Sequence, residues 1–394
     1  MTRVSGSALW LAMLVAASPE HAGAGGPLNS HKGAPVRYRA LTPISFHTDQ
    51  GPLGSIDNAS ATNLAVEGFQ RWENVSTATI AFSHAGQLPE DVDAGNYLTY
   101  LNNFTDGINP IIFDSDGGIT AALFGSGSEN SIIGFAGSAY ATSGPDEGFY
   151  VEGQAVINGK FSSVFPPEEF LATFVHEFGH FLGLDHSQIN APFASDGNTA
   201  NDVYLPTMFP TSTDNDTALV SLNPDDIAAV SALYPAASFS LVTGTIAGTA
   251  LRIDSSPVRG ANVVAISTTD SLYTRISTVT DYLVQNTGDF VVRGLAPGTY
   301  WVRMEPIRPA FTGGSSVGPY ARDLNDLSFL NPVQAEYYNG PNESSDPDID
   351  DPNERTEITV TAGSPTPGIT FAANVVPDAP ALSVIEYHTQ PTYV

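Results

Sequence analysis

The chain has no cysteine among its 394 residues, which excludes disulfide bonds and catalytic thiols. It also has few basic residues, with 14 lysines and arginines against 42 aspartates and glutamates and a net charge of −28. A surface of this charge repels phosphates, so we expect neither nucleic acid nor an anionic membrane as a partner. The acidity itself has two explanations, high solubility and scattered calcium sites, and we favour the first.

Long apolar runs are scarce as well. The run Ala8–Ala17 follows Arg3 and precedes small residues up to Ala24, which is the layout of a secretory signal peptide. The run is too short to cross a bilayer, and no other segment is long and apolar enough. We therefore predict a signal peptide over residues 1–24, no membrane span, and a secreted protein that is extracellular, or periplasmic in transit.

The rest of the chain divides into two regions. After a short linker over residues 25–36, residues 37–236 alternate strand-like runs with helical patterns, which predicts an α+β domain. Its predicted strands are 37–47, 77–83, 110–113, 132–140 and 149–157. Three helices are predicted: one contains Ala61–Trp72, a second begins near Pro167, and a third follows the N-terminal cap Asn223–Asp226. Residues 238–375 read as short strands with Gly/Pro turns, which predicts an antiparallel β-sandwich, followed by a tail over 376–394.

Three of the eight histidines lie in one stretch, HEFGHFLGLDHS. His176 and His180 are four residues apart, so on a helix their imidazoles project from one face, one turn apart. Gly183 allows the chain to leave the helix sharply and to bring back His186 as a third nitrogen ligand. Three protein ligands leave one position open on a tetrahedral zinc, which is the arrangement of a catalytic site. Glu177 lies beside the metal as the candidate general base.

The same stretch matches His-Glu-x-x-His-x-x-Gly-x-x-His, the signature of the metzincin metallopeptidases, and Ser187 resembles the matrixin branch. Met208, 22 residues past the third histidine, resembles the methionine of the metzincin Met-turn, and LNPDDIAAVSALYP resembles the closing helix of matrixin catalytic domains. The resemblance covers roughly residues 37–236. It implies a twisted mixed sheet with an active-site helix and a C-terminal helix, one catalytic zinc, and a substrate pocket walled by Phe209 and Pro210.

Calcium is a second candidate cofactor by the same resemblance. Its candidate ligands are Asp114 and Asp116 in FDSDG, although we favour an Asp-rich turn without a metal. The acidic run ESSDPDIDDPNE reads as a solvated loop rather than a calcium loop, because the EF-hand spacing is absent. Nothing in the sequence pairs the other histidines, so we predict a single zinc.

The second region resembles the carboxypeptidase-regulatory-like, or transthyretin-like, β-sandwiches through VTGTI, GDFVVRGLAPGTYWVRM and ITVTAGSPTPGITF. Such domains are attached to many proteins, so the resemblance implies little about function. Every candidate catalytic residue precedes residue 238. We therefore expect that the sandwich can be removed without abolishing the cleavage of short peptides.

These patterns together predict a monomeric, secreted zinc endopeptidase that acts on proteins or peptides. Glu177 would take a proton from a zinc-activated water and pass it to the departing amine, while the substrate lies as an added strand along a sheet edge. Two alternatives remain open. In one, the protein binds a surface or matrix through its sandwich, and the zinc domain is ancillary or inactive. In the other, the zinc domain hydrolyses something other than peptides.

Overall fold

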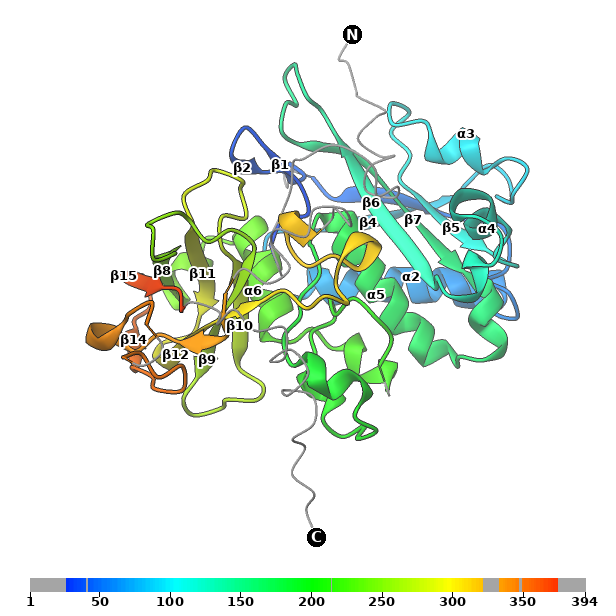
Figure 1. Ribbon diagram of the computed structural model, residues 1–394. Coiled ribbons are helices and arrows are strands. Elements are labelled where there is room, and N and C mark those ends of the chain that lie inside the picture. Colours follow the sequence, from blue (N-terminus) through cyan, green and yellow to red (C-terminus); the bar gives the residue numbers. More distant parts are fainter. Residues whose placement is uncertain (1–25, 40–41, 214, 322–332, 347–348, 375–394) are drawn as a thin grey trace.

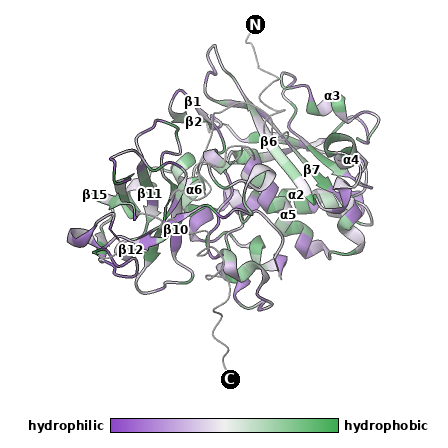
Figure 2. Ribbon diagram, viewed as in Figure 1, coloured by the Kyte–Doolittle hydropathy of each residue, from purple (hydrophilic) through white to green (hydrophobic). Residues whose placement is uncertain are grey.

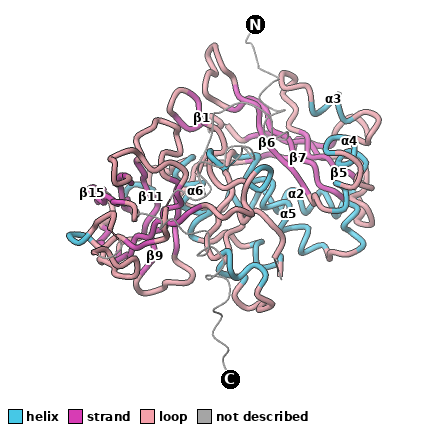
Figure 3. The backbone as a smooth tube through the Cα atoms, viewed as in Figure 1, coloured by secondary structure: helices cyan, strands magenta, loops and turns pink. Residues whose placement is uncertain are grey.

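The computed structural model describes residues 26–39, 42–213, 215–321, 333–346 and 349–374 (Figure 1). The predicted signal peptide and C-terminal tail lie outside these ranges. Within them, no helix is long and apolar enough to cross a membrane. The strands gather in two separate groups, one from each predicted domain, as Figure 3 shows.

The segment predicted as a linker is part of the folded unit from residue 26 onward. Its strands β1 (Ser30–His31) and β2 (Ala34–Pro35) form an antiparallel hairpin. Pro27 forms a β-bridge with Leu184, just beyond the helix that carries the first two histidines. The linker prediction was wrong here. A short polar and glycine-rich segment has no sequence pattern that predicts a strand, and this one is held in place by backbone pairing with distant residues.

The first domain is built on a five-stranded sheet in the order β4-β3-β5-β7-β6. Neighbouring strands are parallel except β6, which lies antiparallel to β7 at one edge. The strands are β3 (Ile44–Thr48), β4 (Phe82–Gln87), β5 (Pro110–Asp114), β6 (Gly134–Tyr140) and β7 (Tyr150–Asn158). Every residue of β5 is buried, as expected for a central strand that is covered on both faces.

Two long helices, α2 (Asn58–Glu73) and α5 (Pro167–Leu182), pack together in the main core of this domain. Phe69 stacks on Phe178 with ring centroids 3.6 Å apart, and Trp72 Nε1 donates to the carbonyl oxygen of Val175 at 2.8 Å. Alternate residues of β5 point to a second core, where Ile112 meets Ile119 of α4 (Gly118–Phe124) and residues of α3 (Tyr97–Leu101). The sheet therefore lies between two apolar layers.

The first two predicted strands are displaced from their predicted positions. Of residues 37–47 only the end forms β3, and Arg37 makes a single bridge with Phe149. The stretch from 77 to 80 does not join the sheet, because Ala78 bridges Pro235 and the amide of Thr79 donates to the carbonyl oxygen of Tyr234. Tertiary pairing with the end of α6 (Pro224–Leu233) overrides the strand propensity of this stretch.

The second region consists of two sheets that face one another across an apolar core. One has the order β10-β9-β12-β13, with β14 also paired to β12, and the other has the order β11-β8-β15. The strands are β8 (Gly244–Leu251), β9 (Ala261–Ser267), β10 (Arg275–Val279), β11 (Asp289–Leu295), β12 (Gly298–Pro306), β13 (Glu336–Tyr337), β14 (Ile358–Val360) and β15 (Pro365–Ala372). The prediction of a purely antiparallel arrangement was wrong in one place, because β15 pairs with β8 in parallel.

The two regions share a wide interface along α6 and the chain that follows His186. Ala228 of α6 belongs to the apolar core of the second region, and a Cβ on Gly294 of β11 would lie only 2.7 Å from the Ala228 Cβ. Ile189 packs on Val264 and Ile266 of β9. In Figure 1, α6 lies between the two groups of strands, and Figure 2 shows hydrophobic colour along the strands and central helices and hydrophilic colour mainly in peripheral loops. After α6, only the short helix α7 (Phe239–Val242) separates the two sequence regions.

Candidate metal centre and active-site cavity

Helix α5 carries the first two histidines, and its ends follow from its sequence. Pro167 at the first position and two acidic residues in the first turn favour its start. It ends at Gly183, whose φ of 94° lies in the left-handed region. A Cβ at Gly183 would also lie 2.5 Å from Tyr150 Cε2, so only glycine fits. The chain turns back here and brings His186 toward the helix.

Each of the three histidines has its Nδ1 atom held by a backbone carbonyl oxygen. The Nδ1 atoms of His176, His180 and His186 lie 2.7 Å from Thr207 O, 2.8 Å from Leu184 O and 2.9 Å from Ser316 O, respectively. Because a carbonyl oxygen only accepts, each Nδ1 carries the hydrogen. The Nε2 atom of each neutral ring is therefore a bare lone pair, as metal-binding histidines require.

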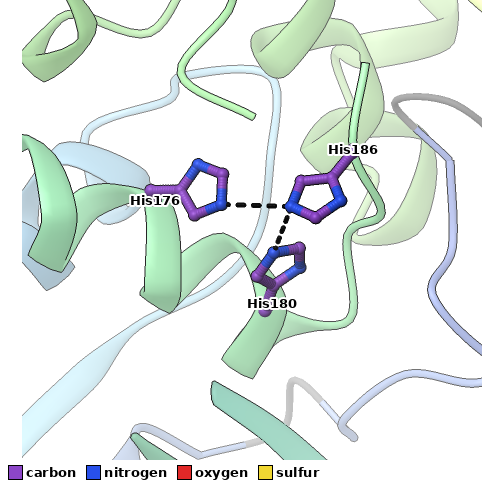
Figure 4. A group of neighbouring side chains, drawn as sticks. All are labelled: His176, His180 and His186. Carbon is purple, nitrogen blue, oxygen red and sulfur yellow. Dashed lines mark hydrogen bonds between the residues drawn. The ribbon is translucent and has the colours of Figure 1, made fainter. Parts of the chain in front are cut away.

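The three Nε2 atoms face one another (Figure 4). His186 Nε2 lies 3.0 Å from His180 Nε2 and 3.3 Å from His176 Nε2. These nitrogens cannot hydrogen bond to one another, because neither ring of a pair has a proton left to donate. Two nitrogens bound to one tetrahedral zinc at about 2.0–2.1 Å lie about 3.3 Å apart, so the three residues fit a zinc ion. Burial lowers the pKa of His176, which favours the neutral ring that metals bind.

Glu177 points into the same space. Its side chain is buried, and its Oε2 atom has no hydrogen-bond partner among the described residues. Burial raises its pKa to about 8. Gly134 at the start of β6 provides the room for this carboxylate, since a Cβ there would lie 3.0 Å from Glu177 Cγ. The carboxylate is therefore free to exchange a proton with a molecule in the cavity.

Met208 lies beneath the histidines, at the position predicted for the Met-turn. It is fully buried, and a Cβ on Gly179 would lie 2.2 Å from its Sδ atom. The amides of Thr207 and Met208 donate to the two carboxylate oxygens of Asp226 at 2.8 and 3.0 Å. Asp226 also accepts from the amide of Asn223 and completes a capping box at the start of α6. The buried carboxylate of Asp226 thus connects the start of α6 to the turn that contains Thr207 and Met208. The same turn orients His176, because Thr207 O accepts from its Nδ1 atom.

Replacing this carboxylate tests the connection. In Asp226→Ala, three backbone N–H groups lose their acceptor, and we expect the free energy of unfolding to fall by about 3 kcal/mol or more. The zinc affinity should fall as well, because the turn that orients His176 loosens. Urea unfolding and zinc competition with a chromogenic chelator would measure both. Asp254→Ala is the control, since Asp254 is exposed; if both variants unfold at the same urea concentration, Asp226 does not hold the turn.

The metal centre lies in a cavity of about 660 Å³. Its walls include the segment Ser131–Ala136, residues of helix α5, the segment Phe209–Ser212 and the segment Gly313–Ser316. Phe209 and Pro210, the predicted pocket wall, both line it. Phe311 of the second region packs edge-on against Phe209, with ring centroids 5.4 Å apart. The second region therefore supplies one wall of the cavity and the carbonyl group that orients His186.

The two candidate calcium ligands lie elsewhere and act as turn acceptors. Asp114 is buried and accepts from both the amide and the hydroxyl group of Thr120, and from the amide of Ile119, at the start of α4. Asp116 accepts from the amide of Gly118 at 2.9 Å. Among the described residues, neither carboxylate belongs to a group of three metal-binding side chains. The structure thus gives the Asp-rich turn that we favoured, and calcium at Asp114 and Asp116 stays a hypothesis.

Sequence reasoning missed three groups that shape the site. The carbonyl oxygens of Thr207 and Ser316 carry no signal in the sequence, because every residue has one. Asp226 does have a signal, since it stands third after the helix cap Asn223, but the pattern only indicates a capping box. Its bonds to the Met-turn could not be predicted.

The mixed sheet, the helix with its two histidines, the third histidine that converges on them and the buried methionine define a class: a metallopeptidase domain of the metzincin type. The model of the matrixin (peptidase M10) family matches residues 44–235, and this part of the chain belongs to that family. The match begins at β3 and ends just after α6. No curated protein matches the chain closely enough for comparison.

Proposed function

We propose that the protein is a secreted zinc endopeptidase. The observation that carries this proposal is the convergence of three Nε2 atoms beside a buried carboxyl group, all lining one cavity in a matrixin domain. A zinc ion bound there supplies Lewis acidity, which polarises a carbonyl group and lowers the pKa of water. The family match supports metallopeptidase chemistry. Endopeptidase cleavage, secretion and a monomeric state are parts of the proposal.

The residues of the chain have distinct roles in this proposal. His176, His180 and His186 hold the ion, and their Nδ1 bonds keep each ring in the one tautomer that can do so. Glu177 takes a proton from the attacking water and gives it to the amine of the departing product. Met208 serves as a packed floor, because its Sδ atom lies against Gly179.

The edge strand β6 supports the predicted mode of substrate binding. Gly134, Phe135 and Ala136 of this strand line the cavity, and in the described sheet β6 pairs only with β7. A peptide could therefore add as a further strand along the outer side of β6, with backbone hydrogen bonds giving affinity. Phe209 and Pro210 would form the wall of a side-chain pocket beyond the scissile bond, and Phe311 packs against Phe209 from the second region.

A cleavage profile tests the proposal. The full mature chain would be incubated with a mixed peptide library, with and without a zinc chelator, and the products identified by mass spectrometry. We expect internal cuts that disappear with the chelator and return with added zinc. Chelator-insensitive cleavage, or no cleavage while ester substrates are hydrolysed, would contradict the peptidase assignment. The alternative of a surface-binding protein with an inactive zinc domain predicts no cleavage at all.

The metal content gives a prediction that does not depend on activity. We expect one tightly bound zinc per chain after dialysis, and a much lower zinc content in His186→Ala, which removes one of the three ligands. Elemental analysis would measure it, with His84→Ala as the control, because His84 bonds to Thr48 in the sheet away from the cavity. Equal zinc contents in the wild type and His186→Ala would show that His186 is not a ligand.

A further inference from the structure

A second group of metal-binding side chains lies in the second region, outside the cavity. Glu336 of β13, Glu343 and Asp350 each place a carboxylate oxygen within 4.8 Å of the other two. Glu336 and Asp350 are fully buried, at 0% exposure, and Glu343 is partly buried. Glu343 and Asp350 belong to the acidic run ESSDPDIDDPNE, which we interpreted from the sequence as a solvated loop. That interpretation was wrong for these two positions, because the loop folds back onto β13.

No positive charge balances these three carboxylates within the described ranges. None of them forms an ion pair there, and the charged groups that act on them are other carboxylates. Burial, with the nearby carboxylates, raises the pKa of Glu336 to about 8 and that of Glu343 to about 7. Buried charges in proteins are normally paired or bound to a metal ion. A nearby cation would offset this repulsion and allow all three carboxylates to ionise at neutral pH.

Two buried amide side chains lie at the same place. Asn339 is 4% exposed and its Nδ2 donates to Asp350 Oδ1 at 2.6 Å, while Asn374 is 3% exposed and its Nδ2 donates to Glu336 Oε2. The carbonyl oxygen of each amide has no hydrogen-bond partner among the described residues. A half-turn of either amide would direct this oxygen at the carboxylates, an arrangement that a cation between them would stabilise. The group thus offers five oxygen-bearing side chains and no nitrogen or sulfur ligand.

We propose that Glu336, Glu343 and Asp350, with the amide oxygens of Asn339 and Asn374, bind a calcium ion that ties the acidic loop to the core of the second region. Calcium prefers six to eight oxygen ligands in flexible geometry, and carboxylates together with amide oxygens are its usual protein ligands. The ligands come from β13, from the loop after it and from the residues just after β15. A bound ion would therefore join β13 and the loop that follows it to the segment after β15. This site is separate from the zinc centre and does not depend on the proposed function.

The test uses the zinc-loaded full chain, dialysed into calcium-free buffer that contains zinc, and compares wild type, Glu336→Gln and Glu354→Gln. Glu354 is exposed in the same acidic run and serves as the matched control. Calcium binding would be measured by equilibrium dialysis with elemental analysis, and the melting temperature would be followed as calcium chloride or magnesium chloride is added. Asp350→Asn provides a second variant if Glu336→Gln does not fold. The difference between variants isolates this site from any calcium bound by the first domain.

We expect wild type and Glu354→Gln to bind one more calcium ion than Glu336→Gln. Their melting temperature should rise by roughly 5–10 °C at calcium concentrations about 100-fold above Kd. Without calcium, Glu336→Gln should melt at or above the wild-type temperature, because glutamine keeps the size of the side chain and removes a buried carboxyl group whose ionisation the other two carboxylates oppose. A role limited to hydrogen bonding predicts the opposite: a lower melting temperature without calcium and no calcium effect in any variant. That result, or equal calcium binding by all three proteins, would overturn the site, and equal stabilisation by magnesium would overturn its assignment to calcium.

Discussion

Glu177→Gln is expected to retain zinc while peptide turnover falls by at least about 10²–10⁴-fold, the usual contribution of a positioned general base. Glutamine keeps the size of the side chain and the space beside Gly134 that holds it, but it cannot accept a proton at neutral pH. The three histidines and the carbonyl oxygens that orient them are untouched. Zinc content by elemental analysis and kcat/KM on a peptide found in the library would be measured together.

Glu168→Gln is the matched control, because it makes the same change at an exposed position in the first turn of the same helix. It should leave both zinc content and turnover close to the wild-type values. Near-normal hydrolysis by Glu177→Gln would show that Glu177 is not the base. A loss of zinc from this variant would instead mean that the carboxylate holds the metal site together, and the drop in turnover would then say nothing about proton transfer.

A chain truncated after Ala237 is expected to lose most of its folded stability and its zinc affinity, contrary to what the sequence suggests. Truncation uncovers a shared apolar cluster in which Leu205, Phe209 and Leu219 pack against Phe311 and Val317. Each apolar side chain that returns to water costs about 1.5–3 kcal/mol, so the total reaches the 5–15 kcal/mol that stabilises a typical domain. His186 also loses the carbonyl oxygen of Ser316.

Soluble yield, melting temperature and zinc content of the truncated chain would decide between the two expectations. A chain cut near residue 375, which keeps all of the described second region, controls for the loss of C-terminal sequence in general and should behave like the full chain. If the chain ending at Ala237 melts within a few degrees of the full chain, binds zinc and cleaves the same peptides, the first domain is independent. The contacts of Phe311 and Ser316 would then be accessory to the metal centre.

The sequence by itself predicted the convergence of the three candidate metal ligands, because their positions depend on local geometry. A spacing of four on a helix places His176 and His180 on one face, and a glycine that must turn the chain returns His186 to them. The same local rules predicted the start of α5 at proline and the capped start of α6. The central strand β5 could also be predicted, since its apolar run is buried on both faces.

Only the tertiary structure decided which distant groups complete these local patterns. The carbonyl oxygen of Ser316 reaches His186 from 130 residues away, and Asp226 holds the turn that contains Met208. Residues 77–80 pair with the end of α6 instead of the sheet, and the acidic loop folds over Glu336. Backbone carbonyls are the same at every position, and acidic residues look alike whether solvated or buried. Their partners are therefore fixed by how the two regions pack, which no local spacing encodes.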